Sequence, residues 1–309
     1  MTPPPQPMQP LSPELTARAL PYSELADEIA ALLAEPGVEV PPRMVMPLAG
    51  QGSLFVMPST DGRLAVTKLI TFTPANVGST RPTIQGDVVV FDVASGARRL
   101  IIDGPTVTAR RTAAVSLLAA RRLAPNADGP LLIVGAGVQG RAHLDAFVDG
   151  LGVERVRIAS RSPASARTLI DYARNRGLEA LPAFDLRRAL DECPLVVTAT
   201  PANGVVLDGT PRADAFIAAV GAFTPQMVEL SPALCHDVAA CGSVVVDTHD
   251  ADHEAGDLIQ AGIDVGAIPA LAQVIREDWP RPTGPVLFKS CGWAGWDLAA
   301  ARLALRAAG

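Results

Sequence analysis

The run LLIVGAGVQG, residues 131 to 140, constrains the fold of this chain more than any other stretch. An all-apolar segment precedes glycines in the spacing G-x-G-x-x-G, and helix-forming sequence follows them. In a β-α-β unit the first glycine permits the tight turn, the second lets a pyrophosphate approach the backbone, and the third allows close helix packing. The helix N-terminus then holds the phosphate charge. The predicted cofactor-binding residues of this loop are Gly135, Gly137, Val138, Gln139 and Gly140.

Strand-like segments alternate with helical segments in the surrounding sequence. The strand-like segments are VERVRIAS, PLVVTAT, AFIAAVG and SVVVDTH, and this alternation predicts an α/β fold with a doubly wound parallel sheet. We therefore expect a Rossmann-type nucleotide-binding domain over residues 126–285.

Residues 1–125 follow a different pattern. An N-terminal helical segment stopped by Pro36 is followed by short strands, a hairpin and a second helical segment. The C-terminal GWAGWDLAAARLALRAAG predicts a helix with buried points at Trp293, Trp296 and Leu303. We expect an α+β substrate-binding and dimerisation domain over 1–125, completed by residues 286–309.

Composition excludes several classes of protein. The chain has 309 residues, 49% hydrophobic and 19% charged, which is typical of a chain that buries a core. A net charge of −6 without a basic stripe argues against nucleic acid, and no run approaches the roughly 18 apolar residues of a membrane span. The proline-rich MTPPPQPMQP predicts a flexible arm rather than a signal peptide.

The cysteines and lysines carry further information. Cys193, Cys235, Cys241 and Cys291 form no C-x-x-C pair, so we expect reduced core thiols in a cytoplasmic protein. Lys68 and Lys289 are the two lysines among 26 basic residues, and the others are arginines. An ammonium group can lose its proton near neutral pH when its surroundings lower its pKa, whereas a guanidinium group cannot.

The second strand of the predicted Rossmann unit favours one cofactor. NAD sites usually carry Asp or Glu at the end of this strand to bind the ribose 2′-hydroxyl. VRIASRSP offers Ser160, Arg161 and Ser162 instead, which can hold a 2′-phosphate through charge-assisted bonds. We predict NADP(H), with a solvated Arg161 as the alternative and NAD(H) still open. At the next strand end, Thr198, Thr200 and Pro201 are expected beside the cofactor, by analogy with the fold.

Isolated basic residues in apolar settings stand out in the first domain. They are Arg43 in VPPRMVMPL, Lys68 in LAVTKLITF and Arg111 in TARRTAAVS. An arginine can clamp a carboxylate with two hydrogen bonds. Taken alone, each arginine is better explained as a surface or salt-bridging residue.

Several motifs together resemble the ornithine cyclodeaminase/μ-crystallin family. TKLITF, TARRTAAVSLLAARRLAP, LLIVGAGVQGRAHLDA, VGAFTPQMVEL and FKSCGWAGWDLAAARL occur in the family's order from about residue 40 to the C-terminus. The resemblance implies a homodimer whose N-terminal domain forms the dimer interface and a substrate pocket facing the nicotinamide. It implies that Arg43, Lys68 and Arg111 hold the substrate carboxylate. It also suggests Thr83 as a polar pocket residue and places Ser290 near the nicotinamide.

The departure from the family pattern is at Phe223, in VGAFTPQMVEL. Members that deaminate or cyclise ornithine, and related alanine dehydrogenases, read Gly-Ala-Asp or Gly-Gly-Asp here, and their Asp handles proton transfer. Phenylalanine cannot accept a proton, which rules out general base catalysis from this position. The ketimine-reducing branch of the family also lacks the Asp.

We therefore predict NADPH-dependent reduction of a cyclic ketimine carboxylate, Δ1-pyrroline-2-carboxylate or Δ1-piperideine-2-carboxylate, to L-proline or L-pipecolate. Arg43 and Arg111 clamp the carboxylate, Lys68 shares that task and supplies a proton, and Phe223 forms an apolar wall that excludes water. Two alternatives stay open: an ornithine cyclodeaminase or amino-acid dehydrogenase that uses another proton-transfer residue, and a non-catalytic NADPH-dependent binding protein.

Other polar residues receive weaker assignments. His249 and His253 have the i, i+4 spacing of a zinc pair, but no third ligand accompanies them, so we predict no metal. Asp247 either faces the cofactor or caps the next helix. His143 is expected to be structural, Asp297 a packing or helix residue, and Lys289 has no assigned role.

Overall fold

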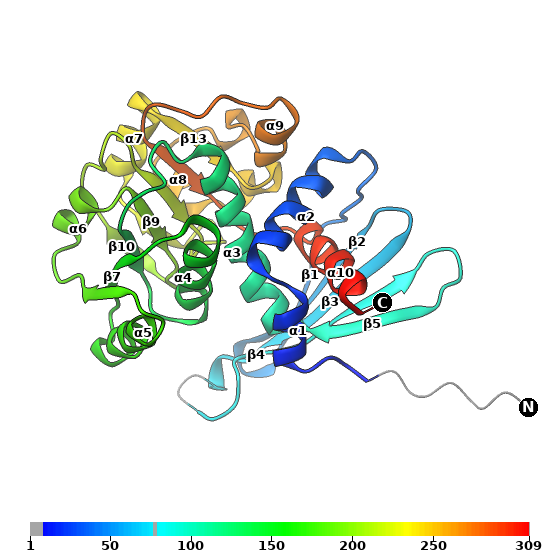
Figure 1. Ribbon diagram of the computed structural model, residues 1–309. Coiled ribbons are helices and arrows are strands. Elements are labelled where there is room, and N and C mark those ends of the chain that lie inside the picture. Colours follow the sequence, from blue (N-terminus) through cyan, green and yellow to red (C-terminus); the bar gives the residue numbers. More distant parts are fainter. Residues whose placement is uncertain (1–8, 77–78, 309) are drawn as a thin grey trace, which may run out of the picture. The chain divides into compact units, whose positions relative to one another are not determined.

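The chain divides into two compact units. The structure, a computed structural model, describes residues 9–76 and 79–308, and most of the predicted proline-rich arm lies outside them. Unit 1 comprises Met1–Arg111 and Ala294–Gly309, and unit 2 comprises Thr112–Trp293 (Figure 1). The first unit boundary follows Arg111, ahead of the boundary predicted after residue 125. The second follows Trp293, later than the boundary predicted before residue 286.

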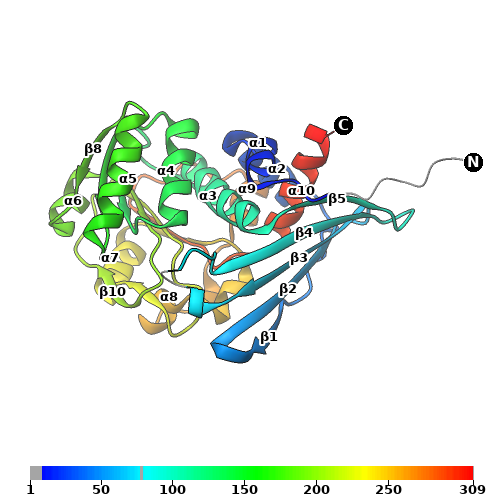
Figure 2. The same cartoon turned by 90° about the horizontal axis from the view of Figure 1, so that it is seen from below.

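Unit 1 is built on a five-stranded antiparallel sheet with its strands in sequence order (Figure 2). Its strands are β1 (Met44–Leu48), β2 (Gly52–Thr60), β3 (Leu64–Phe72), β4 (Ile84–Asp92) and β5 (Arg98–Asp103). In β3, Val66, Lys68 and Ile70 are buried whereas Leu69 is exposed. Because successive side chains of a strand point to opposite faces, Lys68 lies on the face of the sheet that carries the core.

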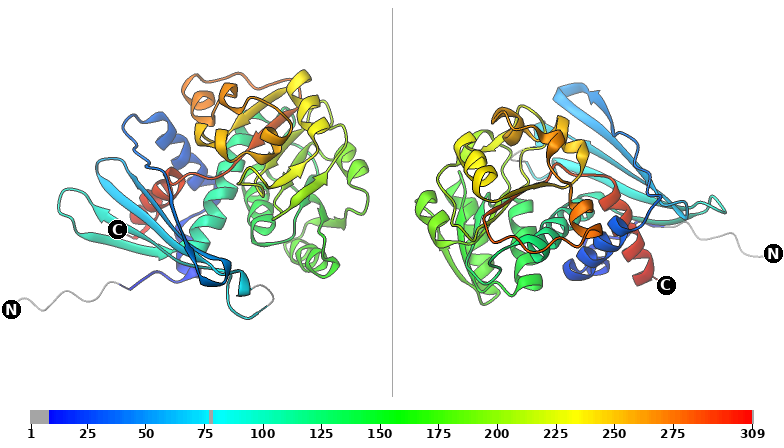
Figure 3. Two further views of the ribbon diagram at one scale, coloured as in Figure 1. Left: turned by 180° about the vertical axis from the view of Figure 1, so that it is seen from behind. Right: turned by 90° about the horizontal axis from the view of Figure 1, so that it is seen from above.

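Helices cover that face of the sheet. They are α1 (Pro13–Ala19), α2 (Tyr22–Ala34), α3 (Gly104–Leu123), whose first part belongs to unit 1, and α10 (Gly295–Ala308). The C-terminal α10 packs against β2 to β5 and against α2 (Figure 3). The prediction of one N-terminal helical segment was wrong. Pro21 separates α1 from α2, because it lacks an N–H group and disfavours helical dihedral angles at Leu20.

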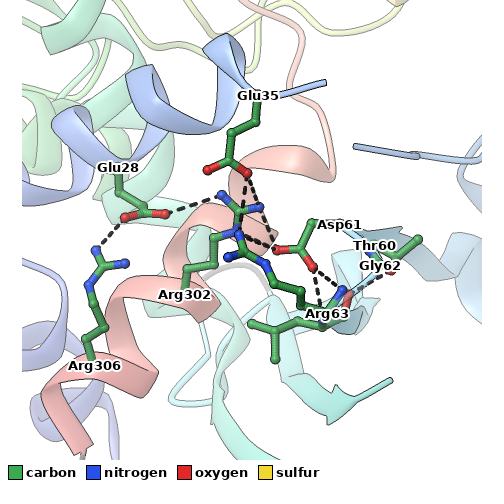
Figure 4. A network of polar contacts seen from close by, with 9 residues as sticks. Glu28, Glu35, Thr60, Asp61, Gly62, Arg63, Arg302 and Arg306 are labelled. Atoms are coloured by element: carbon green, nitrogen blue, oxygen red, sulfur yellow. Dashed lines mark hydrogen bonds and ion pairs between the residues drawn. The ribbon is translucent and has the colours of Figure 1, made fainter. Parts of the chain in front are cut away.

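A buried network of ion pairs fixes α10 (Figure 4). Arg302 is 7% exposed and donates to Asp61 at 2.7 Å and to Glu35 at 2.8 Å. Glu28 of α2 forms ion pairs with Arg302 and with Arg306. The network therefore joins α10 to α2 and to the turn between β2 and β3. The network thereby fixes the position of α10, whose first turn carries Asp297.

Unit 2 contains a seven-stranded parallel sheet with the order β13-β14-β11-β9-β6-β7-β8. Its strands are β6 (Leu131–Val134), β7 (Arg155–Ala159), β8 (Glu179–Pro182), β9 (Leu195–Thr198), β11 (Phe216–Ala219), β13 (Ser243–Val246) and β14 (Val286–Lys289). The central strands are buried along their whole length, as expected of a parallel sheet covered on both faces. From β6 the chain passes to β7 and β8 on one side and then returns to form β9 and β11 on the other side. This reversal makes a topological switch point between β6 and β9. The predicted Rossmann-type fold is confirmed.

The remaining elements of unit 2 surround this sheet. Its helices are α4 (Val138–Leu151), α5 (Pro163–Asn175), α6 (Leu186–Glu192), α7 (Pro232–Cys241), α8 (Gly256–Gln260) and α9 (Leu271–Arg276), and β10 (Asn203–Leu207) pairs with β12 (Val228–Leu230). Within residues 9–76 and 79–308 no helix is long and apolar enough to cross a membrane.

The four cysteines are free thiols, but not all are core residues. Cys193, Cys235 and Cys291 are buried, whereas Cys241 is exposed at the C-terminal end of α7. The prediction of a core position was therefore wrong for Cys241.

Candidate active site

The glycine loop of unit 2 has the geometry that its sequence predicts. Gly135 has φ +117°, and a Cβ there would lie 2.4 Å from the carbonyl oxygen of Ala199. A Cβ on Gly140 would lie 1.8 Å from the carbonyl oxygen of Gly135. A Cβ on Gly137, in contrast, would meet no atom within 4 Å. The first and third glycines therefore permit close packing, while the second leaves open space above the backbone.

A cavity of about 630 Å³ lies at the carboxyl ends of β6, β7 and β9. Gly135, Ala136 and Gly137 line it, and Gly137 is the N-cap of α4 without a side-chain hydrogen bond. The first N–H groups of that helix are therefore available to a phosphate group. The cavity and the open space at Gly137 fit a dinucleotide with its pyrophosphate on the loop.

The residues predicted to choose the cofactor also line this cavity. Arg161 is exposed, and Ser160 and Ser162 flank it. The Ser162 hydroxyl accepts a hydrogen bond from the N–H of Ser165 at 3.2 Å, so it also caps α5. No carboxylate occurs among the described residues that line the cavity.

The other predicted cofactor residues lie in different surroundings. Thr200 and Pro201 line the cavity, but Thr198 is fully buried and its hydroxyl donates to Glu229 at 3.0 Å. The buried Ser290 hydroxyl donates to Asp247 at 2.8 Å. Two further residues follow the glycine loop in α4: Val138 is 73% exposed, and Gln139 is partly buried.

Among the lining residues that were not predicted, one is aromatic. Phe184, which follows β8, is 93% exposed and borders the cavity. Because β8 was not predicted as a strand, no sequence signal placed this aromatic ring at the carboxyl edge of the sheet.

In unit 1 the structure brings the predicted lysine and an arginine to one carboxylate. The Nζ atom of Lys68 lies 3.0 Å from Oδ2 of Asp297, and Nε of Arg111 lies 3.5 Å from Oδ1. Lys68 is 1% exposed and Asp297 0% exposed, so both charges are withdrawn from water. Arg43, directly before β1, is partly buried and close enough for its charge to act on Lys68. Two cations, Lys68 and Arg111, therefore share one buried carboxylate, and the charge of Arg43 acts on the same lysine.

This environment changes the acidity of Lys68. Burial lowers its pKa to about 8, the Asp297 carboxylate opposes that decrease, and the charges of Arg111 and Arg43 add to it. A lysine with this pKa is largely protonated at neutral pH and can release its proton easily. Asp297, expected only as a packing or helix residue, is therefore part of the cationic site.

The last two predicted substrate residues lie in different units. Thr83 of unit 1 is partly buried, and its carbonyl oxygen accepts a hydrogen bond from the N–H of Thr73. Phe223 follows β11 in unit 2 and is 44% exposed. Their contact with substrate stays a prediction.

Lys289 and Asp247 are both interior residues. The Nζ atom of Lys289 donates to the carbonyl oxygen of Ala222 at 2.5 Å and to Asp257 at 2.7 Å. Asp247 was expected to face the cofactor or cap the next helix. The capping alternative was wrong, because Thr248 is the N-cap of the 3-10 helix that follows, and a position facing the cofactor stays a prediction. Its carboxylate accepts hydrogen bonds from Ser290 and from the N–H groups of Cys291 and Gly292, which fixes the chain after β14.

The histidines form no metal centre in the part of the chain that is described. His143 is buried between the carbonyl oxygen of Gln139 and the Ser116 hydroxyl, and burial lowers its pKa to about 4, so it is neutral at physiological pH. His249 and His253 are exposed on a short 3-10 helix. The described residues contain no group of three or more His, Cys, Asp or Glu arranged to hold a metal ion.

Comparison with known proteins identifies the family. The sequence profile of the ornithine cyclodeaminase/mu-crystallin family matches residues 19–307. This chain belongs to that family. It is 35% identical to Delta(1)-pyrroline-2-carboxylate reductase 1 of Burkholderia multivorans over 292 residues, 94% of this chain and 92% of the relative. It is 32% identical to the ketimine reductase mu-crystallin of Mus musculus over 273 residues, 86% of this chain and 84% of that one.

A solved structure of the family has the same fold. It is the Delta(1)-pyrroline-2-carboxylate reductase of Thermococcus litoralis in complex with NADH and L-proline, with a TM-score of 0.88 and 25% identity over 97% of both chains. The family resemblance drawn from sequence motifs is thus confirmed.

Proposed function

We propose that this protein is an NAD(P)H-dependent imine oxidoreductase that reduces Δ1-pyrroline-2-carboxylate, Δ1-piperideine-2-carboxylate or both, giving L-proline and L-pipecolate. The observation that carries the proposal is the buried cationic site in which Lys68 and Arg111 share Asp297. The names of the reductases that it resembles support the same reaction.

The cationic site binds and orients the substrate carboxylate. Lys68 and Arg111 carry two positive charges against the single charge of Asp297, so a second carboxylate is attracted to this pair, with Arg43 near Lys68. Bidentate arginine contacts fix the plane of a carboxylate as well as its position. Holding the imine carbon in one orientation supplies much of the rate gain of a reaction between two bound molecules.

Lys68 supplies the proton. Its pKa of about 8 keeps the ammonium form dominant at neutral pH, so it can protonate the imine nitrogen as the C=N bond is reduced. The nicotinamide cofactor, when bound, supplies the hydride for C2 of the ring. Phe223 offers no base at the end of β11, which favours reduction over deamination.

We further propose NADP(H) as the preferred cofactor. Ser160, Arg161 and Ser162 border the cavity, and the guanidinium group of Arg161 suits a 2′-phosphate. The absence of a carboxylate among the described lining residues supports the same preference.

One experiment tests the reaction and the cofactor together. Oxidation of NADPH by the purified protein is followed with the five-membered and six-membered cyclic imines and repeated with NADH. We expect turnover of at least one ring, with kcat/KM for NADPH about tenfold or more above that for NADH. Ornithine and alanine should release no ammonia. No turnover of either ring contradicts the reductase, and equal efficiency with NADH contradicts the role of Arg161.

The exposed face of the unit 1 sheet supports a homodimer. Leu69 and Phe91 are 43% and 38% exposed, and all of β1, including Met44 at 55%, is exposed. Contiguous apolar surface on a sheet commonly marks a protein interface. We expect sedimentation velocity to give twice the chain mass at micromolar concentration, and Leu69→Arg to shift it toward one chain. A wild-type monomer would contradict the dimer.

We also propose a reducing cytoplasmic location, because the cysteines are free thiols.

A further inference from the structure

A buried carboxylate joins two strand ends of unit 2. Glu229 in β12 is 0% exposed. Its Oε1 atom accepts hydrogen bonds from the N–H and the hydroxyl of Thr200, at 2.6 and 2.9 Å. Its Oε2 atom accepts from the hydroxyl of Thr198 at 3.0 Å and from the N–H of Gly221 at 2.7 Å. The side chain thus connects the end of β9 to the end of β11.

The four donors suit the ionised form of Glu229. The N–H groups of Thr200 and Gly221 can only donate, whereas the two threonine hydroxyls donate here and can also accept. Burial raises the pKa of Glu229, and the charge of Lys289 together with the hydrogen bonds from Thr200 opposes that increase. Hydrogen bonds to an ionised carboxylate are stronger than those between neutral groups. The link between the strand ends is therefore stiff.

The same contact explains the glycine after β11. A Cβ on Gly221 would lie 2.2 Å from the carbonyl oxygen of Thr200 and 2.5 Å from Oε1 of Glu229. Neither the backbone nor the carboxylate can move aside without breaking the hydrogen bonds. Glycine at this position lets the β11 end approach the β9 end.

Lys289 and Asp257 hold Glu229 in turn. Asp257 accepts hydrogen bonds from the N–H groups of Glu229 and Leu230, at 2.6 and 2.9 Å. The Nζ atom of Lys289 donates to the other carboxylate oxygen of Asp257 at 2.7 Å. Burial disfavours the charge of Lys289, but Asp257 raises its pKa, so it stays a cation. The second lysine of the chain thus fixes the backbone that carries Glu229.

The strand end held by Glu229 is a wall of the dinucleotide cavity. Ala199, Thr200, Pro201 and Ala202 all line that cavity. We propose that Glu229 is a positioning residue for the dinucleotide. Through its hydrogen bonds to Thr200 and Gly221 it holds the cavity wall 199–202 in place. The proposal rests on the dinucleotide cofactor of the proposed function and is independent of which imine is reduced.

The variant Glu229→Gln tests this role directly. The glutamine amide accepts on one side only, so on the other side its NH2 group meets a backbone N–H, of Thr200 or Gly221, that loses its acceptor, and that part of the link is broken. We expect the Kd for NADPH, measured by fluorescence titration without imine, to rise about tenfold or more. In steady state the KM for NADPH should rise, while the KM for the imine at saturating NADPH changes less than about twofold. Glu192→Gln, at the C-terminal end of α6 and outside the cavity lining, is the matched control with an unchanged Kd.

A second, milder variant tests the same role if Glu229→Gln does not fold. Thr198→Val removes one donor to Glu229 and does not alter a cavity-lining residue. We expect a smaller rise in the Kd for NADPH, about threefold. If either folded variant shows a lower melting temperature and an unchanged Kd, Glu229 is only structural and the proposal is overturned. Wild-type protein that binds NADPH but reduces neither imine would sink the proposed reaction, whereas the predicted Kd changes would still support this role.

Discussion

Replacing Lys68 with methionine is expected to lower kcat/KM for imine reduction by about a thousandfold. The variant loses both the proton donor and a cation that faces the substrate carboxylate, and general acid catalysis alone contributes 10²- to 10⁴-fold. Methionine has a similar length, and Arg111 stays beside Asp297, so the buried site keeps its shape and a counter-charge. Steady-state NADPH oxidation with the better imine measures the effect, and the Kd for NADPH should be unchanged.

Two further variants interpret that loss. Lys68→Arg keeps the positive charge but not a releasable proton, so we expect imine binding to be largely retained and kcat to fall. Lys289→Met should affect NADPH binding and protein stability rather than the imine step. A loss below tenfold in Lys68→Met, or an equal loss of kcat in Lys289→Met at saturating NADPH, would mean that the substrate site is elsewhere.

Asp297→Asn is expected to move the pH dependence of the reaction toward lower pH. The active form of Lys68 is protonated, so kcat/KM of the wild type should be level below pH 8 and fall above it, in line with a pKa of about 8. Burial lowers this pKa and Asp297 opposes the decrease. Removing the carboxylate leaves burial and the charge of Arg111 unopposed, so the pKa decreases further. Activity near pH 7.5 should drop about tenfold and recover in more acidic buffer.

A purely structural role for Asp297 would give a different result. Loss of stability lowers activity at every pH and leaves the midpoint of the descending limb in place. We expect a lower free energy of unfolding as well, by about 3 kcal/mol, because two buried cations lose their partner. A descending limb that stays near pH 8 in Asp297→Asn would contradict the assignment of Lys68 as the proton donor.

Much of the nucleotide-binding unit could be predicted because its signals are local. Strands of a parallel sheet are buried on both faces, so LLIV, LVVT and FIAA are continuous apolar runs that can be recognised in the sequence. The glycine spacing has one backbone explanation, and Gly135 and Gly140 have the close approaches that it requires. The strand VLFK was missed, since a short apolar run beside prolines gives no sign that it inserts between β11 and β13.

The Rossmann loop, the family, the scarcity of lysine and the lack of a base at Phe223 can all be recognised in the sequence, because each depends on neighbouring residues or on residue type. Which charges meet depends on the packing of elements that are far apart in the chain. Asp297 lies 229 residues from Lys68 along the chain and reaches it because α10 packs on the core face of β3. Glu229 likewise serves the cavity wall through strand ends that come together in the sheet. Periodicity can indicate that a side chain is buried, but its partner depends on which elements pack together.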